Sequence, residues 1–129
     1  MILDTSALAA IFFDEPEAQR FTQIIHDAER CLISAGTFVE LSIVLEAQIG
    51  SDAVRQCEMF FRRGGIVIEP FTVEQAHLAR QAFHDFGKGR HPAGLNFGDC
   101  FAYALAKYTG DPLLFKGSDF KKTDIVSAL

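Results

Sequence analysis

The chain has 129 residues, of which 49% are hydrophobic and 22% are charged, as expected for one globular domain spanning residues 1–129. Its net charge of −5 argues against a protein that holds nucleic acid mainly through a basic surface. The charge does not exclude a nuclease in which a bound metal ion carries the positive charge. The three cysteines lie far apart, which argues against a disulfide framework and a zinc site. No apolar run is longer than residues 7–13 and no basic leader is present, which argues against a membrane span, so we expect a cytoplasmic protein.

The first half of the chain alternates short apolar runs with helical patterns. Met1 to Leu3 predict a buried strand, and residues 6–13 and 14–29 predict a helical hairpin whose second helix has Pro16 near its first position. The next elements are a strand at 31–35, a helix at 36–50, a helix at 51–65 capped by Ser51, and a strand at 66–71.

The second half continues the alternation. Thr72 begins a helix that stops at Gly87, and the segment 87–94 has three glycines and a proline, which is typical of a loop. A helix at 96–110 and a strand at 112–115 follow, and residues 124–128 supply a fifth short strand or an edge. This order predicts a three-layer α/β/α sandwich with a mainly parallel central sheet of four to five strands.

Four acidic residues stand near the predicted carboxyl ends of the strands, where open parallel sheets bind their ligands. Asp4 ends the first strand, Glu40 lies in the helix after the second, Asp99 begins the helix before the fourth, and Asp119 follows that strand. If the sheet brings them together, four unpaired carboxylates would repel one another, and a hard divalent cation such as Mg²⁺ or Mn²⁺ would relieve that repulsion. We therefore expect a metal site.

Each acid also has a structural explanation. Thr37 with Glu40, and Asn96 with Asp99, have the spacing of a helix-capping pair. Asp4 could cap the helix that begins near Ser6, and Asp119 could open a turn. What favours the metal site is that all four acids fall at the same end of the predicted sheet.

Four segments together resemble a known family. The segments "ILDTSAL", "TFVEL", "GLNFGDCFAYALAK" and "PLLFKGSDFKKTDI" are similar, in order and spacing, to PIN-domain ribonucleases, specifically VapC toxins of type II toxin-antitoxin pairs. The resemblance implies that Asp4 and Asp99 are the metal ligands, that Glu40 is a third acid, and that Ser6 orients a water or phosphate. Many PIN domains have an acid or Asn where this chain has Gly117, so Asp119 is assigned as the fourth acid, with Asp124 as the alternative. The absence of an acid or Asn at residue 117 would affect the binding of a second metal ion and not of the first.

The same resemblance implies the reaction and the partners. The chain would be an Mg²⁺-dependent endoribonuclease, with Mn²⁺ able to substitute, that hydrolyses RNA with metal-activated water and leaves a 5′-phosphate and a 3′-hydroxyl. It would form a homodimer, could enter a larger toxin-antitoxin assembly, and would be neutralised by a small VapB-like antitoxin. Apolar residues in 10–15 and 37–45 would suit an antitoxin helix, or they are ordinary core.

Two other functions stay open at this stage. The chain could be a catalytically silent interaction module on the same fold, or a metal-dependent phosphohydrolase with another substrate, although the DxD pattern is absent because residue 6 is Ser. The loop residues Lys88, Arg90 and His91 could grip an RNA backbone or belong to an ordinary solvated loop.

Overall fold

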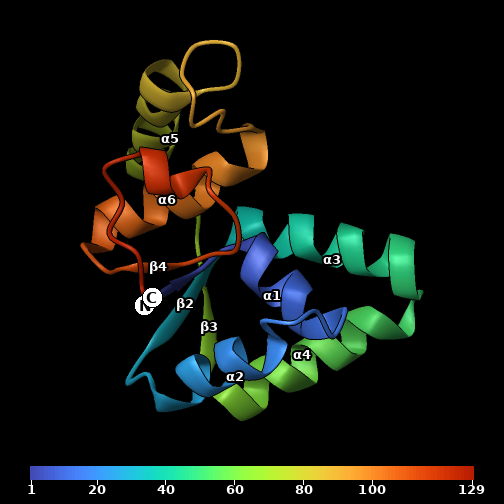
Figure 1. Cartoon of the computed structure of the whole chain (residues 1–129). Helices are drawn as coiled ribbons and strands as arrows, with labels where there is room; N and C mark the ends of the chain where they lie inside the picture. Colours follow the sequence, from blue (N-terminus) through green and yellow to red (C-terminus); the bar gives the residue numbers. More distant parts are fainter.

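A parallel sheet of four strands forms the centre of the computed structural model, which describes all residues 1–129 (Figure 1). The strands are β1 (Ile2–Leu3), β2 (Cys31–Ser34), β3 (Ile66–Glu69) and β4 (Leu113–Leu114), in the order β3-β2-β1-β4. The expected fifth strand is reduced to one isolated bridge between Ser127 and Leu113. The carboxyl ends of β1, β2 and β4, which the acidic residues follow, therefore meet at one edge of the sheet.

Helices cover both faces of the sheet, which confirms the three-layer prediction. They are α1 (Thr5–Phe12), α2 (Ala18–Asp27), α3 (Ala35–Ile49), α4 (Asp52–Gly64), α5 (Val73–Phe86) and α6 (Phe97–Thr109), followed by the short 3₁₀ helix η1 (Phe120–Lys122). Side chains of α1 to α4 share one buried cluster with the sheet, and side chains of α5 and α6 share the other.

The alternation of side chains along each strand separates these two cores. Ile2, Leu32 and Leu113 face α5 and α6, whereas Leu3, Ile33 and Leu114 face α1 to α4. Both faces of β1, β2 and β4 are covered, so these strands are buried along their length, as is usual for a parallel sheet, whereas the edge strand β3 leaves Val67 and Ile68 half-exposed.

Two helix starts differ from the predictions, and a third keeps its predicted cap residue without the capping hydrogen bond. The second helix begins at Ala18, so Pro16 lies in the turn before it, and Ser51 stands at the cap position of α4 without a capping hydrogen bond. The prediction that Thr37 and Glu40 form a capping pair is wrong. Helix α3 starts directly at the end of β2, and its cap is Ser34, whose side chain accepts a hydrogen bond from the backbone nitrogen of Gly36.

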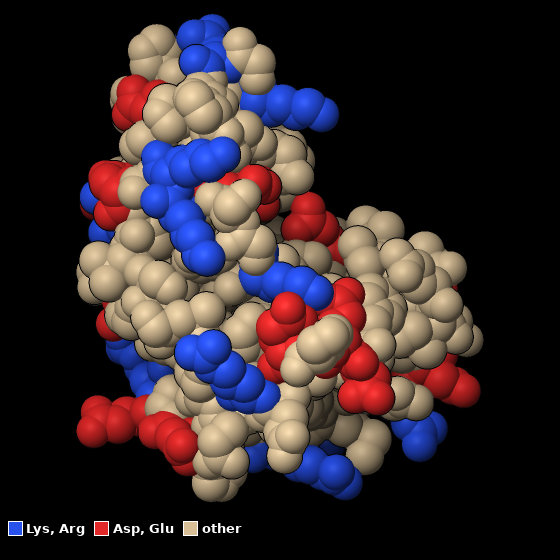
Figure 2. Space-filling model, in the orientation of Figure 1, with Lys and Arg blue, Asp and Glu red and all other residues tan.

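The molecule is hollowed between the part that carries α5 and α6 and the part that carries α3, and acidic side chains lie in this hollow (Figure 2). None of the helices combines the length and the apolar character that crossing a bilayer requires.

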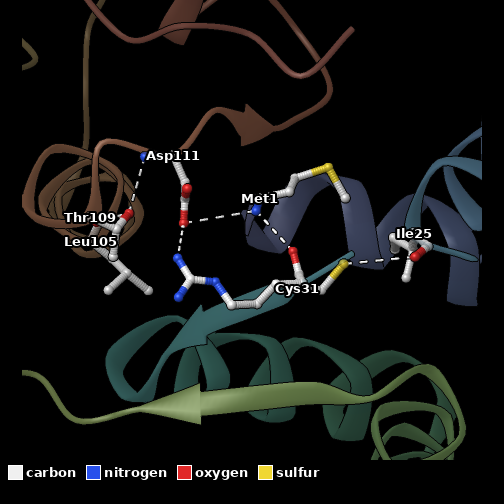
Figure 3. A network of polar contacts seen from close by, with 7 residues as sticks. Met1, Ile25, Cys31, Leu105, Thr109 and Asp111 are labelled. Atoms are coloured by element: carbon white, nitrogen blue, oxygen red, sulfur yellow. Dashed lines mark hydrogen bonds and ion pairs between the residues drawn. The ribbon is translucent and has the colours of Figure 1, made fainter. Parts of the chain in front are cut away.

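At the opposite end of β1, a polar network joins β1, β2 and the segment before β4 (Figure 3). The carboxylate of Asp111 accepts a hydrogen bond of 2.7 Å from Nη2 of Arg30 and lies 3.9 Å from the backbone nitrogen of Met1. The same nitrogen donates to the carbonyl oxygen of Arg30 at 2.9 Å. These contacts fix the amino end of the strand whose other end carries Asp4.

Candidate active site

Asp4 is the cap of α1 and also keeps one carboxylate oxygen free. Its Oδ2 accepts hydrogen bonds from the backbone nitrogen of Ser6 at 3.0 Å and from Oγ of Ser6 at 2.5 Å. The residue is only 3% exposed, yet its Oδ1 is buried without a hydrogen-bond partner. A buried carboxylate oxygen without a partner is costly, so this atom is where a ligand would be most favourable.

Ser6 links Asp4 to the end of β4. Its Oγ donates to Asp4 and accepts a hydrogen bond of 2.9 Å from the backbone nitrogen of Lys116. The ammonium group of Lys116 is in turn paired with the carboxylates of Glu15 and Glu17 in the turn between α1 and α2. The carboxylate of Asp4 is therefore oriented by Ser6, and the backbone of a distant part of the chain holds Ser6 in place.

Glu40 lies on α3 and approaches the site because α6 carries a glycine opposite it. Its Oε1 accepts a hydrogen bond of 2.5 Å from Oγ1 of Thr5. A Cβ on Gly98 would lie only 1.7 Å from Oε2 of Glu40, so no other residue fits there while Glu40 stays in place. The sequence predictions missed Thr5 and Gly98, and no local pattern in the sequence marks either residue.

Asp99 caps its own helix and keeps one oxygen for the site. It forms the expected capping box with Asn96, in which Oδ2 of Asp99 accepts from the backbone nitrogen of Asn96 at 3.0 Å. The structure gives its Oδ1 no hydrogen bond. Capping and ligand binding are thus compatible at both Asp4 and Asp99, since each role uses a different oxygen.

The carboxylates are close enough to change one another's proton affinity. Burial, followed by the nearby charges of Asp4, Asp119 and Glu40, raises the pKa of Asp99 to about 7, against the opposing hydrogen bond from Asn96. Burial raises the pKa of Asp4 to about 6, with a smaller contribution from Glu40 and opposition from the Ser6 hydrogen bonds. The structure therefore brings the four predicted acids into one electrostatic cluster, which a bound cation would stabilise.

The cluster is looser than a closed metal site. No three Asp, Glu, His or Cys side chains are close enough together, as placed, to hold one metal ion. The donor set still fits a hard divalent cation, because every donor is a carboxylate oxygen and Oδ1 of Asp4 has no other partner. Asp4 and Asp99 could hold such an ion with modest side-chain movement.

The two remaining acids have different places. Asp119 is exposed at the start of η1, makes no capping hydrogen bond, and acts on Asp99 through its charge. Asp124 lies apart from the cluster, where it accepts hydrogen bonds from Oη of Tyr103 at 2.7 Å and from Nζ of Lys107 at 2.9 Å. Gly117 has φ of +101°, a backbone conformation that favours glycine over the acid or Asn of many PIN domains.

Comparison with known proteins identifies the family. The family model for the PIN domain matches residues 1–126. The chain is 44% identical over 127 residues to "Ribonuclease VapC30" of Mycobacterium tuberculosis, covering 98% of this chain and 97% of that protein. It is 42% identical over 127 residues to "Ribonuclease VapC" of Mycolicibacterium smegmatis, covering 98% of each. The chain is therefore a PIN-domain protein.

Solved structures agree on the fold. The crystal structure of Mycobacterium tuberculosis VapC20, a sarcin-ricin loop cleaving toxin, matches with a TM-score of 0.79 at 16% identity, covering 97% of this chain and 95% of that one. A toxin-antitoxin complex from Klebsiella pneumoniae matches with a TM-score of 0.72 at 16% identity, covering 99% and 97%. With the curated relatives above, the chain belongs to the VapC ribonucleases.

Proposed function

We propose that this protein is the toxin of a toxin-antitoxin pair, an endoribonuclease that hydrolyses RNA phosphodiester bonds at the acidic cluster. The observation that carries the proposal is the buried Oδ1 of Asp4, which has no protein partner although the residue lies within the influence of the charges of Glu40 and Asp99. Residues 1–129 act as one domain, and we place the protein in the cytoplasm.

Asp4 and Asp99 are the proposed metal ligands, and Glu40 and Asp119 are the further acids of the site. The chemistry that a bound Mg²⁺ or Mn²⁺ supplies here is the activation of water and the neutralisation of charge on the phosphate. The residues of the chain orient the carboxylates that would bind the ion. Ser6 and Asn96 fix the two ligands through their capping hydrogen bonds, and Thr5 holds the carboxylate of Glu40.

The proposed partners are a VapB-like antitoxin and a second copy of the chain. Helices α1 and α3 pack on each other, and most apolar residues of the segments 10–15 and 37–45 belong to or pack against the core, so the predicted groove is largely ordinary packing. Val39 and Ile43 are the exception, because they are exposed one turn apart on α3. This exposed apolar pair is consistent with a surface that contacts another protein, and we propose that the contact is made with a second copy of the chain in a homodimer.

Cleavage of a mixed RNA pool with and without Mg²⁺, comparing wild type with Asp99→Asn and mapping the cut sites, tests the function. We expect Mg²⁺-dependent cuts with the wild type and none with the variant, at unchanged far-UV circular dichroism. If metal binds and no RNA is cut, the phosphohydrolase alternative is favoured. A protein that neither binds metal nor cleaves RNA would be the silent module.

A further inference from the structure

The cations that lack an acidic partner are unevenly placed around the active site. Of the twelve Lys and Arg residues, three form ion pairs with carboxylates, and these are Arg30, Lys107 and Lys116. The other nine are exposed and have no such pair. Four of them lie in two neighbouring segments: Lys88 and Arg90 in the loop 87–94, and Lys121 and Lys122 in η1. These four are called the basic strip below.

The basic strip begins beside the acidic cluster, and one contact joins its two segments. Helix η1 follows directly after Asp119, and Nζ of Lys122 lies 3.5 Å from the carbonyl oxygen of Pro92 in the loop. Figure 2 shows Lys and Arg side chains following one another from the loop at the top of the view toward the acidic hollow. Phosphates of a bound strand would therefore meet positive charge on this side of the site.

The turn between α1 and α2, on another side of the site, offers phosphates no net positive charge. There, Lys116 is neutralised by Glu15 and Glu17, and Asp14 lies in the same turn between α1 and α2. A phosphate placed here would face more carboxylates than ammonium groups, which is unfavourable.

His91 serves the structure of the loop. Its Nδ1 accepts a hydrogen bond of 3.0 Å from the backbone nitrogen of Ala93, and its ring packs edge-to-face on Phe86 with a centroid distance of 5.2 Å. Of the three loop residues predicted to grip RNA, only Lys88 and Arg90 extend freely.

We infer that the RNA strand leaves the active site over η1 and the loop 87–94 rather than over the turn between α1 and α2, with its phosphates held by the basic strip. This inference rests on the proposed ribonuclease function. Contacts to phosphates are independent of base sequence, so the strip would set affinity and the direction of the bound strand, while other contacts select the cut site.

The test compares two double variants that remove the same charge. Lys121→Gln with Lys122→Gln removes half of the strip, and Arg62→Gln with Arg63→Gln removes two exposed charges in the last turn of α4, just before the amino end of β3. The measurements are kcat and KM for RNA cleavage at several salt concentrations, and the affinity for a single-stranded RNA by fluorescence anisotropy without metal.

We expect the lysine variant to raise KM and the dissociation constant by roughly tenfold and to lower the salt slope of binding by about 1.4, since each contact to single-stranded nucleic acid contributes about 0.7. Its kcat should stay at the wild-type value, and the arginine variant should match the wild type throughout. Unchanged affinity and slope in the lysine variant, or an equal loss in the arginine variant, would overturn the inference. Weakened antitoxin binding at unchanged RNA affinity would also overturn it.

These outcomes separate the two claims. If the wild type cleaves RNA and the lysine variant binds as tightly, only the basic strip is rejected. If the wild type cleaves no RNA, the proposed function is rejected, and the anisotropy measurement still decides whether the strip holds RNA.

Discussion

The carboxylate of Glu40 occupies the space that a side chain on residue 98 would need, because a Cβ on Gly98 would lie 1.7 Å from Oε2 of Glu40. The close approach brings α3 and α6 together at the active site, and it depends on the absence of a single methyl group. Glu40 and Asp99 thereby reach one cluster from two different helices.

Gly98→Ala should separate activity from stability. The methyl group would displace the mobile end of the Glu40 side chain rather than backbone, so we expect cleavage to fall about tenfold or more. The free energy of unfolding should change little, because the displaced Glu40 carboxylate loses a contact while alanine favours the helix over glycine by up to about 1 kcal/mol, and the two effects oppose each other. Kinetics and urea unfolding provide the measurements. In a Glu40→Ala background the same substitution should no longer affect activity, and a further loss there would show that Gly98 has another role.

Ser6→Ala should weaken the active site through Asp4. The hydroxyl donates to Oδ2 of Asp4 and accepts from the backbone nitrogen of Lys116, so its loss leaves both without that partner. We expect a loss of about 1–2 kcal/mol in the free energy of unfolding and a fall in kcat of about tenfold. Ser42→Ala is the matched control, since that hydroxyl donates to the carbonyl oxygen of Phe38 on α3. Equal kcat for the two variants would contradict the positioning role of Ser6.

The metal-free protein should lose stability as the pH rises through the range of these carboxyl groups. The folded chain raises the pKa of Asp4 to about 6 and of Asp99 to about 7 from 3.8, so it binds protons more tightly than the unfolded chain does. The stabilisation from protonation is therefore complete below about pH 4 and is lost as the pH rises toward 8. Thermal unfolding in chelator should show a falling Tm from pH 5 to 8. The fall should be smaller in Asp99→Asn, and an equal slope in that variant would contradict the assignment.

Asp119 and Asp124 should respond differently to the same substitution. Asp119 acts on Asp99 through its charge, whereas Asp124 is engaged by Tyr103 and Lys107. We expect Asp119→Asn to lower the rate of cleavage and Asp124→Asn to leave it unchanged, with at most about 1 kcal/mol lost in stability because the ion pair with Lys107 is exposed. Rates at saturating Mg²⁺ decide the matter. The reverse order of effects would make Asp124 the fourth acid.

The sequence predicts the alternation of strands and helices because buried parallel strands and amphipathic helices leave strong periodic signals. It fails where a local contact is decided by tertiary structure. The spacing of Thr37 and Glu40 suggested a cap at Thr37, whereas α3 begins directly where β2 ends and Ser34 is its cap. The segment predicted as a fifth short strand or an edge forms a single bridge between Ser127 and Leu113, made by two backbone hydrogen bonds.

For the site, the positions of the acids relative to strands were predictable, and their orientation was not. The sequence suggests that Asp4 and Asp99 either cap helices or bind metal. The structure shows that each uses Oδ2 for its cap, which leaves the other oxygen available. The need for glycine opposite Glu40 arises from the packing of α3 on α6, and no local pattern encodes that distance.

The central claim is that Asp4 and Asp99 hold a divalent cation, and titration calorimetry with Mn²⁺ tests it most directly. We predict that the wild type binds Mn²⁺, that Asp4→Asn weakens binding by at least about tenfold while remaining folded by circular dichroism, and that Asp124→Asn binds like the wild type. Equal Mn²⁺ affinity in Asp4→Asn and the wild type, or no binding by the wild type, would contradict it.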